Sequence, residues 1–360
     1  MRLILAAGVI VLHGSIVCHG QLVEIEVWQS PARPIFRMIL PMFFALSGFL
    51  VAGSLMRSRT LVMFLGLRII RIFPALSVEV ALSALILGPM FTSRALSTYF
   101  QSDEFSAYWW NIIGHVHYRL PGVFETNPNP GVVNGQLWTV PYELYCYLTI
   151  TCLTLAGAIG RRWILSAAAA AITFAYLAYR EAAHGMIEAS IIGPLPGAML
   201  VVCFLLGAAI HFYRDEIPFG MVAGAIAFGA SALLLSWMPY GDYLAAWPVA
   251  YATVCLGLLD PMRTPIVKGA DYSYGLFLYG YPIQQALAAT SDALRYWPVN
   301  VVATMIVGSL VAILSWRFVE RPALGMRSRL RALEELWLKR AAAPENSPRQ
   351  GAATDAAPLS

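Results

Sequence analysis

Residues 2–13 read RLILAAGVIVLH, an apolar stretch that carries Arg2 at its start and His13 well inside it. An α-helix turns about 100° per residue, so residues eleven positions apart lie on one helix face, roughly 16 Å apart along the axis. Ionisable groups at membrane depth are costly and usually face a protein interior or a wet cavity. The pair therefore indicates a functional site. The ordinary alternative is an Arg that reaches the membrane surface and a His satisfied by a neighbouring helix.

The rest of the chain has the same apolar character. Of its 360 residues, 59% are hydrophobic and only 12% are charged, whereas soluble domains carry roughly 25% charged residues. Stretches long enough to cross about 30 Å of hydrocarbon recur at about residues 3–19, 38–56, 73–91, 137–156, 163–179, 189–211, 218–237, 243–259, 272–290 and 298–316. The sequence therefore predicts an all-α, polytopic integral membrane protein with about ten transmembrane helices.

Lys and Arg residues predict the orientation of these helices, because they concentrate on the cytoplasmic side. If the N-terminus is cytoplasmic, 18 of the 24 Lys and Arg residues lie on that side and six lie on the other. We therefore expect both termini in the cytoplasm, which agrees with an even number of spans. The net charge of +4 follows from this bias and suggests no nucleic-acid partner.

The longest external segment, about residues 92–136, is rich in aromatic residues, Pro, Gly and Asn. Loops of this length tend to be functional lids or binding loops. Its Trp and Tyr side chains suit the apolar faces of sugar rings, and the alternative is an aromatic belt at the membrane interface. His115 and His117 alternate here without further ligands close in sequence, so no metal site is predicted.

We expect a single membrane domain over residues 1–330. A basic amphipathic juxtamembrane helix is expected from about residue 317, lying on the anionic inner leaflet of the membrane. Residues 331–360 are expected to hold the basic end of this helix and a disordered cytoplasmic tail, because the last twenty residues are small, polar and Pro-containing.

Two polar features lie in or beside the second and third spans. Arg68 and Arg71 are three residues apart, share a helix face and precede Pro74. Arginines at a cytoplasmic face clamp phosphates bidentately, and the alternative is that they only set the topology. Ser47 and Gly48 offer a hydroxyl and a close backbone approach, although such small residues often serve helix packing.

Another polar feature stands at the start of the fourth span, which reads LWTVPYELYCYL. It carries Trp138, Tyr142 and Glu143 just inside the expected external boundary. A carboxylate at that depth needs a partner or water, as His13 does.

These segments, in this order, resemble the membrane acyltransferase-3 superfamily, which includes the O-acyltransferases of bacterial surface polysaccharides. Its signature of Arg, ten residues and His is matched by Arg2 and His13. The other matches are FFxLSGF at residues 43–49, Arg-x-x-Arg with Pro at 68–74, Trp and Glu at 138 and 143, SYGxYLxxxP at 273–282 with Phe277 in place of the second Tyr, and Glu-x-Pro at 320–322. The resemblance covers residues 2 to about 330.

The sequence departs from the family in two places. Relatives carry a further segment before the Arg, whereas here Arg2 follows Met1 directly. We expect that the family's cytoplasmic approach to the first span is missing, or that the true start lies upstream. Many relatives have a His where Gly280 and Tyr281 stand, so no catalytic role is assigned to that position.

The resemblance implies a chemistry as well as a fold. The expected donor is cytoplasmic acyl-coenzyme A, usually acetyl-coenzyme A, with no bound cofactor. The expected acceptor is a glycan hydroxyl at the periplasmic face of the bacterial cytoplasmic (inner) membrane. Arg68 and Arg71 are expected to bind phosphates of the coenzyme, with Arg2 contributing at the same surface.

The catalytic set expected from these residues centres on His13. A neutral imidazole can take a proton from a sugar hydroxyl, or it can be acylated transiently and relay the group. Glu143 is expected to orient His13 or to bind the acceptor. Ser47 is expected to supply an oxyanion donor, and Trp138 and Tyr142 to support the acceptor.

A polytopic transporter or flippase for a glycan or small molecule is the main alternative function. It would bind its substrate without consuming acyl-coenzyme A. No duplicated half with corresponding broken helices is apparent in the sequence, which disfavours common transporter designs. The sequence leaves open the acyl group, the sugar, the hydroxyl modified and the oligomeric state.

Overall fold

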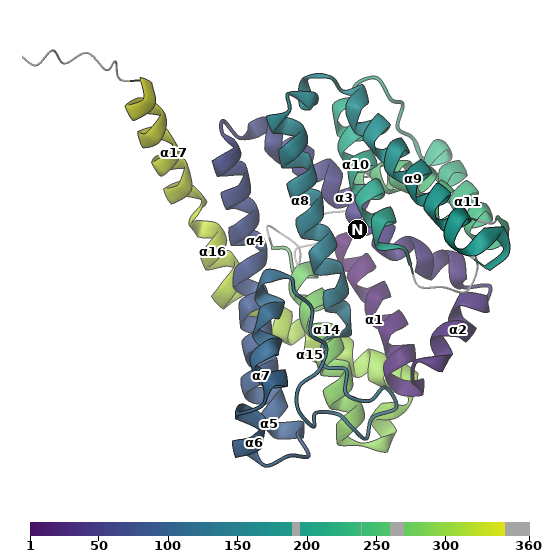
Figure 1. Ribbon diagram of the computed structural model, residues 1–360, viewed down its shortest axis with the longest axis vertical. Coiled ribbons are helices and arrows are strands. Elements are labelled where there is room, and N and C mark those ends of the chain that lie inside the picture. The colour runs from purple at the N-terminus through teal and green to yellow at the C-terminus, as the bar shows by residue number, and fades with distance from the viewer. Residues whose placement is uncertain (189–194, 239, 260–269, 343–360) are drawn as a thin grey trace, which may run out of the picture.

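The computed structural model describes residues 1–188, 195–238, 240–259 and 270–342. Within these residues the chain is helical and forms no β-strand beyond one isolated bridge between Thr92 and Val123. Each of the ten predicted apolar stretches contains a helix (Figure 1). The all-α prediction is therefore confirmed for the described part of the chain.

Four of the helices are long and apolar enough to cross a membrane. They are α1 (Arg2–His19), α3 (Arg33–Arg57), the run Leu61–Phe91 formed by α4 (Leu61–Leu82), the π-helical η1 (Ser83–Leu87) and α5 (Gly88–Phe91), and the run Trp297–Leu336. The other six predicted stretches correspond to α8 (Val140–Leu155), α9 (Trp163–Glu188), α10 (Gly197–Phe212), α11 (Met221–Trp237), α13 (Ala246–Leu258) and α14 (Ser273–Thr290). This helix content is that of a membrane protein.

The third long helix begins twelve residues before its predicted span. Thr60 caps α4, and its side chain accepts a hydrogen bond from the Met63 amide at 3.1 Å. Helix formation starts there because Thr is a favourable N-cap and the following LVMFLGL segment is apolar. Arg68 and Arg71 consequently lie inside α4 and not in the segment before it.

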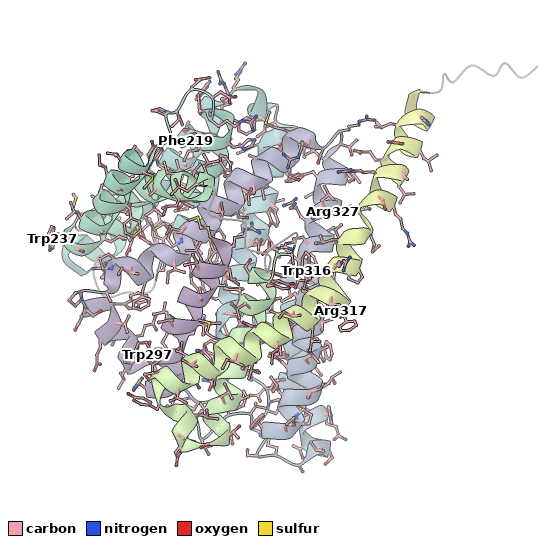
Figure 2. The ribbon with its side chains drawn as sticks, turned by 180° about the vertical axis from the view of Figure 1, so that it is seen from behind. Phe219, Trp237, Trp297, Trp316, Arg317 and Arg327 are labelled. Carbon is pink, nitrogen blue, oxygen red and sulfur yellow. The ribbon has the colours of Figure 1, made fainter. Side chains whose placement is uncertain are left out.

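The C-terminal helices also differ from the prediction. The tenth helix, α15 (Trp297–Ser315), runs on through the π-helical η7 (Trp316–Glu320) and α16 (Arg321–Gly325) into α17 (Arg327–Ala342). The predicted juxtamembrane helix is thus an extension of the tenth helix, and Figure 2 shows it along the back of the molecule. Residues 343–360, which hold most of the predicted tail, lie outside the described residues.

Helix α3 is central and packs against α1, α10, α11 and α13. Its crossing with α10 is close because glycines stand at the contact. A Cβ added to Gly48 would lie 1.9 Å from the Phe204 carbonyl oxygen, and one added to Gly207 would lie 2.0 Å from that of Ala45. Small residues allow such backbone approach between apolar helices, so the predicted close approach at Gly48 is confirmed.

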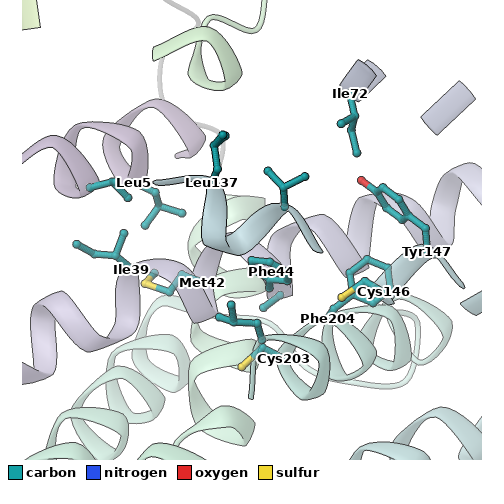
Figure 3. Packing of buried hydrophobic residues seen from close by; sticks show 14 of the residues in the cluster. Leu5, Ile39, Met42, Phe44, Ile72, Leu137, Cys146, Tyr147, Cys203 and Phe204 are labelled. Carbon is teal, nitrogen blue, oxygen red and sulfur yellow. The ribbon is translucent and has the colours of Figure 1, made fainter. Parts of the chain in front are cut away.

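The main hydrophobic core lies where α1, α3, α4, α8 and α10 meet, together with the 3₁₀-helix η3 (Gly135–Thr139). Figure 3 shows Leu5, Ile39, Met42, Phe44, Ile72, Leu137, Cys146, Tyr147, Cys203 and Phe204 interdigitating there. The core therefore fixes the relative positions of the helices that also carry the predicted site residues.

The predicted external loop is an ordered structure. It contains α6 (Leu96–Phe100), α7 (Asp103–Tyr108) and η2 (Trp109–Ile113), followed by an irregular segment up to η3. These elements gather at the end of the molecule opposite the tip of α17 (Figure 1).

Candidate active site

A cavity of about 800 Å³ lies between α1, α3, α4, α8, α14 and the C-terminal helices. Its volume falls within the range of about 300–1,000 Å³ that is typical of small-molecule and cofactor sites. Seven arginines line it, Arg2, Arg57, Arg59, Arg68, Arg71, Arg327 and Arg331, against four carboxylates, Glu143, Asp271, Glu334 and Glu335. The cavity therefore has an excess of positive charge and suits an anionic ligand.

Two of these arginines converge on one carboxylate. The Arg2 and Arg71 guanidinium groups donate to Oδ2 of Asp271 at 3.2 and 2.5 Å, and the Ser273 hydroxyl donates to Oδ1 at 2.5 Å. Burial alone would raise the pKa of Asp271, but the two guanidinium groups and Ser273 outweigh it and hold that pKa below its usual value. The network joins the N-terminus of α1, the middle of α4 and the start of α14.

Arg71 also faces a second carboxylate, that of Glu320. Its Nη1 lies 3.7 Å from Oε2 of Glu320, which is buried in η7. Oε1 of Glu320 accepts a hydrogen bond from the Ser315 hydroxyl at 3.2 Å. The Glu-x-Pro segment thus supplies a buried partner for Arg71, whose positive charge is shared between two carboxylates.

Arg68, one turn away on α4, has different surroundings. It donates to the Ser54 hydroxyl at 3.0 Å, and its guanidinium carbon lies 6.0 Å from the centre of the Tyr147 ring. In the described part of the chain no carboxylate forms an ion pair with it, and its buried Nε has no hydrogen-bond partner. Arg68 therefore retains donors and charge for a ligand in the cavity.

Glu143 and Ser47 line the same cavity. The Glu143 carboxylate accepts a hydrogen bond from the Tyr147 hydroxyl at 2.6 Å, one turn further along α8. The cavity therefore brings together five of the eight predicted site residues, which are Ser47, Glu143, Arg2, Arg68 and Arg71.

His13 is not among the residues that line the cavity. Its ring meets the Tyr281 ring edge to face, with centroids 5.1 Å apart, and the Tyr281 hydroxyl accepts a hydrogen bond from the Asn129 amide at 2.6 Å. None of the described residues forms a hydrogen bond with the His13 ring. His13 therefore lies outside the cavity lining, where its ring contacts Tyr281, whereas Glu143 belongs to the lining.

Trp138 and Tyr142 also lie outside the cavity lining. Their rings contact each other edge to face with centroids 5.9 Å apart. Tyr142 packs against the start of α10, because a Cβ added to Gly197 would lie 1.9 Å from its ring. Their role with an acceptor stays a prediction.

Amide side chains join the external loop to α14 through hydrogen bonds. The Asn127 amide donates to the backbone and side-chain oxygens of Gln285 at 2.9 and 2.7 Å, and the Gln285 amide donates to the carbonyls of Asn129 and Val132 at 2.9 and 2.8 Å. Gln136 donates to the Leu278 carbonyl at 2.5 Å. These bonds show that the NPNP segment (127–130) and the YGYPIQQ segment (279–285) hold each other in place. This contact was not predicted from the sequence.

A groove of about 460 Å³ lies between α7 and residues 116–119 of this loop. Asp103, Glu104, His117, Tyr118 and Arg119 line it, and His117 approaches a His115 ring nitrogen at 2.8 Å. Burial, and then the proximity of the His115 ring, lowers the pKa of His117. Across the described residues no group of three or more His, Cys, Asp or Glu side chains is arranged to hold a metal ion.

The buried carboxylate of Glu79 was not among the residues predicted from the sequence. It is 1% exposed on α4 and accepts hydrogen bonds from the Ser83 hydroxyl at 2.9 Å and the Asn134 amide at 3.2 Å. The signal was a single acidic residue within an apolar span, which is costly in a membrane and therefore marks a specific role. Here it ties α4, at the start of the π-helical turn, to the external loop.

Comparisons with known proteins identify the family of this chain. A family model described as an acyltransferase domain, that of acyltransferase-3, matches residues 1–317. The chain is 27% identical to nodulation protein 10 of Rhizobium leguminosarum bv. viciae, over 80% of this chain and 82% of that protein. It is 24% identical to an O-acetyl transferase of Shigella phage Sf6, over 78% of this chain and 82% of that protein. No solved structure is significantly similar.

Proposed function

The chain belongs to the acyltransferase-3 family, and on that premise we propose that it is a membrane-embedded O-acyltransferase. It moves an acyl group from cytoplasmic acyl-coenzyme A to a hydroxyl of a surface or exported polysaccharide or oligosaccharide. Acetyl is the favoured group, because one relative is named an O-acetyl transferase. The cavity that gathers Arg2, Arg68, Arg71 and Glu143 carries the proposal.

The charge of the cavity supports acyl-coenzyme A as the donor. Acyl-coenzyme A carries a diphosphate and a 3′-phosphate at one end and the thioester at the other. Arginine binds phosphate through two parallel hydrogen bonds, and Arg68 lines the cavity without an ion pair to any described carboxylate. Arg2 and Arg71, which are held by Asp271, shape the wall beside it.

The membrane arrangement belongs to the proposal as well. The ten helices cross the inner membrane of a bacterium with both termini in the cytoplasm, which places the arginine-lined cavity on the cytoplasmic side. The external loop at residues 92–136 then faces the periplasm. An acceptor glycan would meet the groove beside Tyr118 and Arg119, with Trp138 and Tyr142 nearby in sequence.

His13 performs the chemistry in this scheme. As a general base it takes the proton of the acceptor hydroxyl while the oxygen attacks the thioester carbonyl. The carbon–sulfur bond then breaks, and the thiolate leaves as coenzyme A and takes up a proton. In the relay version the His13 nitrogen forms the first bond to the acyl carbon and later passes the group to the hydroxyl. Ser47 donates to the oxyanion, and Glu143 supplies one of the carboxylates of the donor cavity.

The decisive experiment supplies radiolabelled acetyl-coenzyme A to the purified protein in liposomes with a surface glycan as acceptor. We expect free thiol to be released in step with label in the glycan. His13→Ala should abolish both while expression and membrane insertion remain intact, and His19→Ala, an exposed histidine on the same helix, should leave both unchanged.

Two outcomes would contradict this function. Movement of glycan across the bilayer without release of thiol would identify a transporter or flippase. Full acyl transfer by the His13→Ala variant would remove His13 from the mechanism. In cells, mass spectrometry of glycan esters with and without the protein identifies the acceptor.

A further inference from the structure

We propose that helix α17 binds the phosphorylated nucleotide end of the donor, with Arg327 and Arg331 as the residues that recognise its 3′-phosphate. This inference rests on the proposed function, because it assumes that coenzyme A occupies the cavity. It assigns α17 a task that the sequence did not suggest, since that helix was expected only to lie on the membrane surface.

The position of α17 supports this assignment. Arg327 and Arg331 line the cavity, and at a spacing of four residues they share one face of the helix. Arg327 lies where α17 leaves the body of the molecule (Figure 2). The helix is anchored there, because the Thr60 hydroxyl donates to the Glu334 carboxylate at 2.6 Å and Leu330 contacts α4 at Gly66. The two arginines are therefore part of the cavity wall.

The charges around Arg327 indicate an anionic ligand. Arg68, Arg71 and Arg331 all act on it as like charges. In the described part of the chain neither Arg327 nor Arg331 forms an ion pair with a carboxylate, and Glu334 on the same helix is held by Thr60. Neighbouring guanidinium groups repel one another. A ligand with several phosphate charges would reduce this repulsion.

The exposure of the residues that line the cavity indicates how the donor molecule is oriented in it. Of the residues that line the cavity, Asp271, Tyr274 and Glu143 are partly buried, whereas Arg327 and Arg331 are exposed. Acyl-coenzyme A is a linear molecule with its thioester and its 3′-phosphate at opposite ends. When the thioester points inward, the 3′-phosphate remains at the mouth beside α17.

These arginines lie beyond the part of the chain that the acyltransferase model matches, which ends at residue 317. The matched helices supply Arg2, Arg68 and Arg71, and α17 adds the remaining wall. Recognition of the 3′-phosphate is therefore a feature of this chain that the family match does not include.

The test compares three acetyl donors, acetyl-coenzyme A, acetyl-dephospho-coenzyme A, which lacks the 3′-phosphate, and acetyl-pantetheine. We expect the Arg327→Ala, Arg331→Ala double variant to raise KM for acetyl-coenzyme A about tenfold or more with kcat unchanged, because charge-assisted bonds to phosphate are lost. KM for the other two donors should hardly change. Arg329→Ala, an exposed arginine of α17 outside the cavity lining, should behave as the wild type.

Binding of coenzyme A and dephospho-coenzyme A to the detergent-purified protein, measured by calorimetry, separates this inference from the proposed function. Wild-type protein that prefers coenzyme A and loses the preference in the double variant supports the α17 site even if it transfers no acyl group. Equal loss of affinity for both compounds in the double variant would overturn the inference. So would weaker binding to anionic-lipid nanodiscs with unchanged coenzyme affinity, which would assign the arginines to lipid headgroups.

Discussion

At the scale of single residues, Arg68 and Arg71 show how neighbours decide what a charge can do. They stand one turn apart on α4, yet Arg71 lies against Asp271 and Glu320 while Arg68 contacts a serine hydroxyl and two aromatic rings. A guanidinium paired with carboxylates holds helices together, and one without such partners is available to a ligand. The same Arg-x-x-Arg motif therefore supplies one group that pairs with carboxylates and one that we propose binds the donor.

Arg71→Ala should destabilise the fold more than Arg68→Ala does. The change leaves Glu320 buried without its cation, and breaking a buried ion pair costs about 3–5 kcal/mol. Thermal unfolding in detergent measures this, and adding Glu320→Gln to Arg71→Ala should recover part of the loss because it removes the unpaired charge. Equal unfolding temperatures for Arg68→Ala and Arg71→Ala would contradict the assignment.

Asp271 gives a pH dependence with a defined sign. Its pKa is lower in the folded protein than its usual value of about 3.9, so its stabilising effect is fully present above that value and is lost as the pH falls through the folded pKa. The stability difference between wild type and Asp271→Asn should therefore stay constant from pH 8 to pH 5. A difference that already fades between pH 7 and pH 5 would show that the carboxylate is not held by Arg2 and Arg71.

At the scale of elements, the pairing of α3 with α10 depends on the absence of side chains at the crossing. Gly48→Ala should force the helices apart, because its new Cβ would meet the Phe204 carbonyl oxygen at 1.9 Å, and overpacking of this kind costs about 1–3 kcal/mol or more. Gly229→Ala in α11 is the matched control, since its Cβ would meet nothing within 4 Å. Similar unfolding temperatures for the two variants would contradict this account.

Two elements also contain π-helical turns beside buried carboxylates. Glu79 precedes η1 by one turn, and Glu320 closes η7. Such turns interrupt regular helix bonding and often occur at functional sites. In this chain each π-helical turn lies next to a buried acidic residue, Glu79 at 1% exposure and Glu320 at 2% exposure.

At the scale of the whole molecule, the cavity and the external loop lie toward opposite ends of the helices, and the proposed topology makes these ends the cytoplasmic and periplasmic sides. Single cysteines at Arg331 and at Glu104 test this in intact cells treated with a membrane-impermeant thiol reagent. A version with the five natural cysteines replaced is the background. We expect labelling at residue 104 alone, and labelling of residue 331 in unbroken cells would reverse the orientation.

Much of the fold followed from the sequence because hydropathy is a local property. Each apolar stretch of about 20 residues predicts a helix without reference to the others, and all ten stretches contain helices. The boundaries were less predictable. Arg68 and Arg71 suggested that the third span begins after them, but α4 begins at the Thr60 cap and extends through them. Inside the helix, Arg71 pairs with Asp271 and Glu320, which lie far along the chain.

The sequence by itself determined that this protein is helical, apolar enough for a membrane and a member of the acyltransferase-3 family, because these properties reside in short segments and their order. Only the tertiary structure decided which charges meet. Arg71 and Asp271 are 200 residues apart and form one ion pair, while His13 contacts Tyr281 and Glu143 contacts Tyr147. Such pairings depend on how helices pack, and local sequence patterns do not specify that.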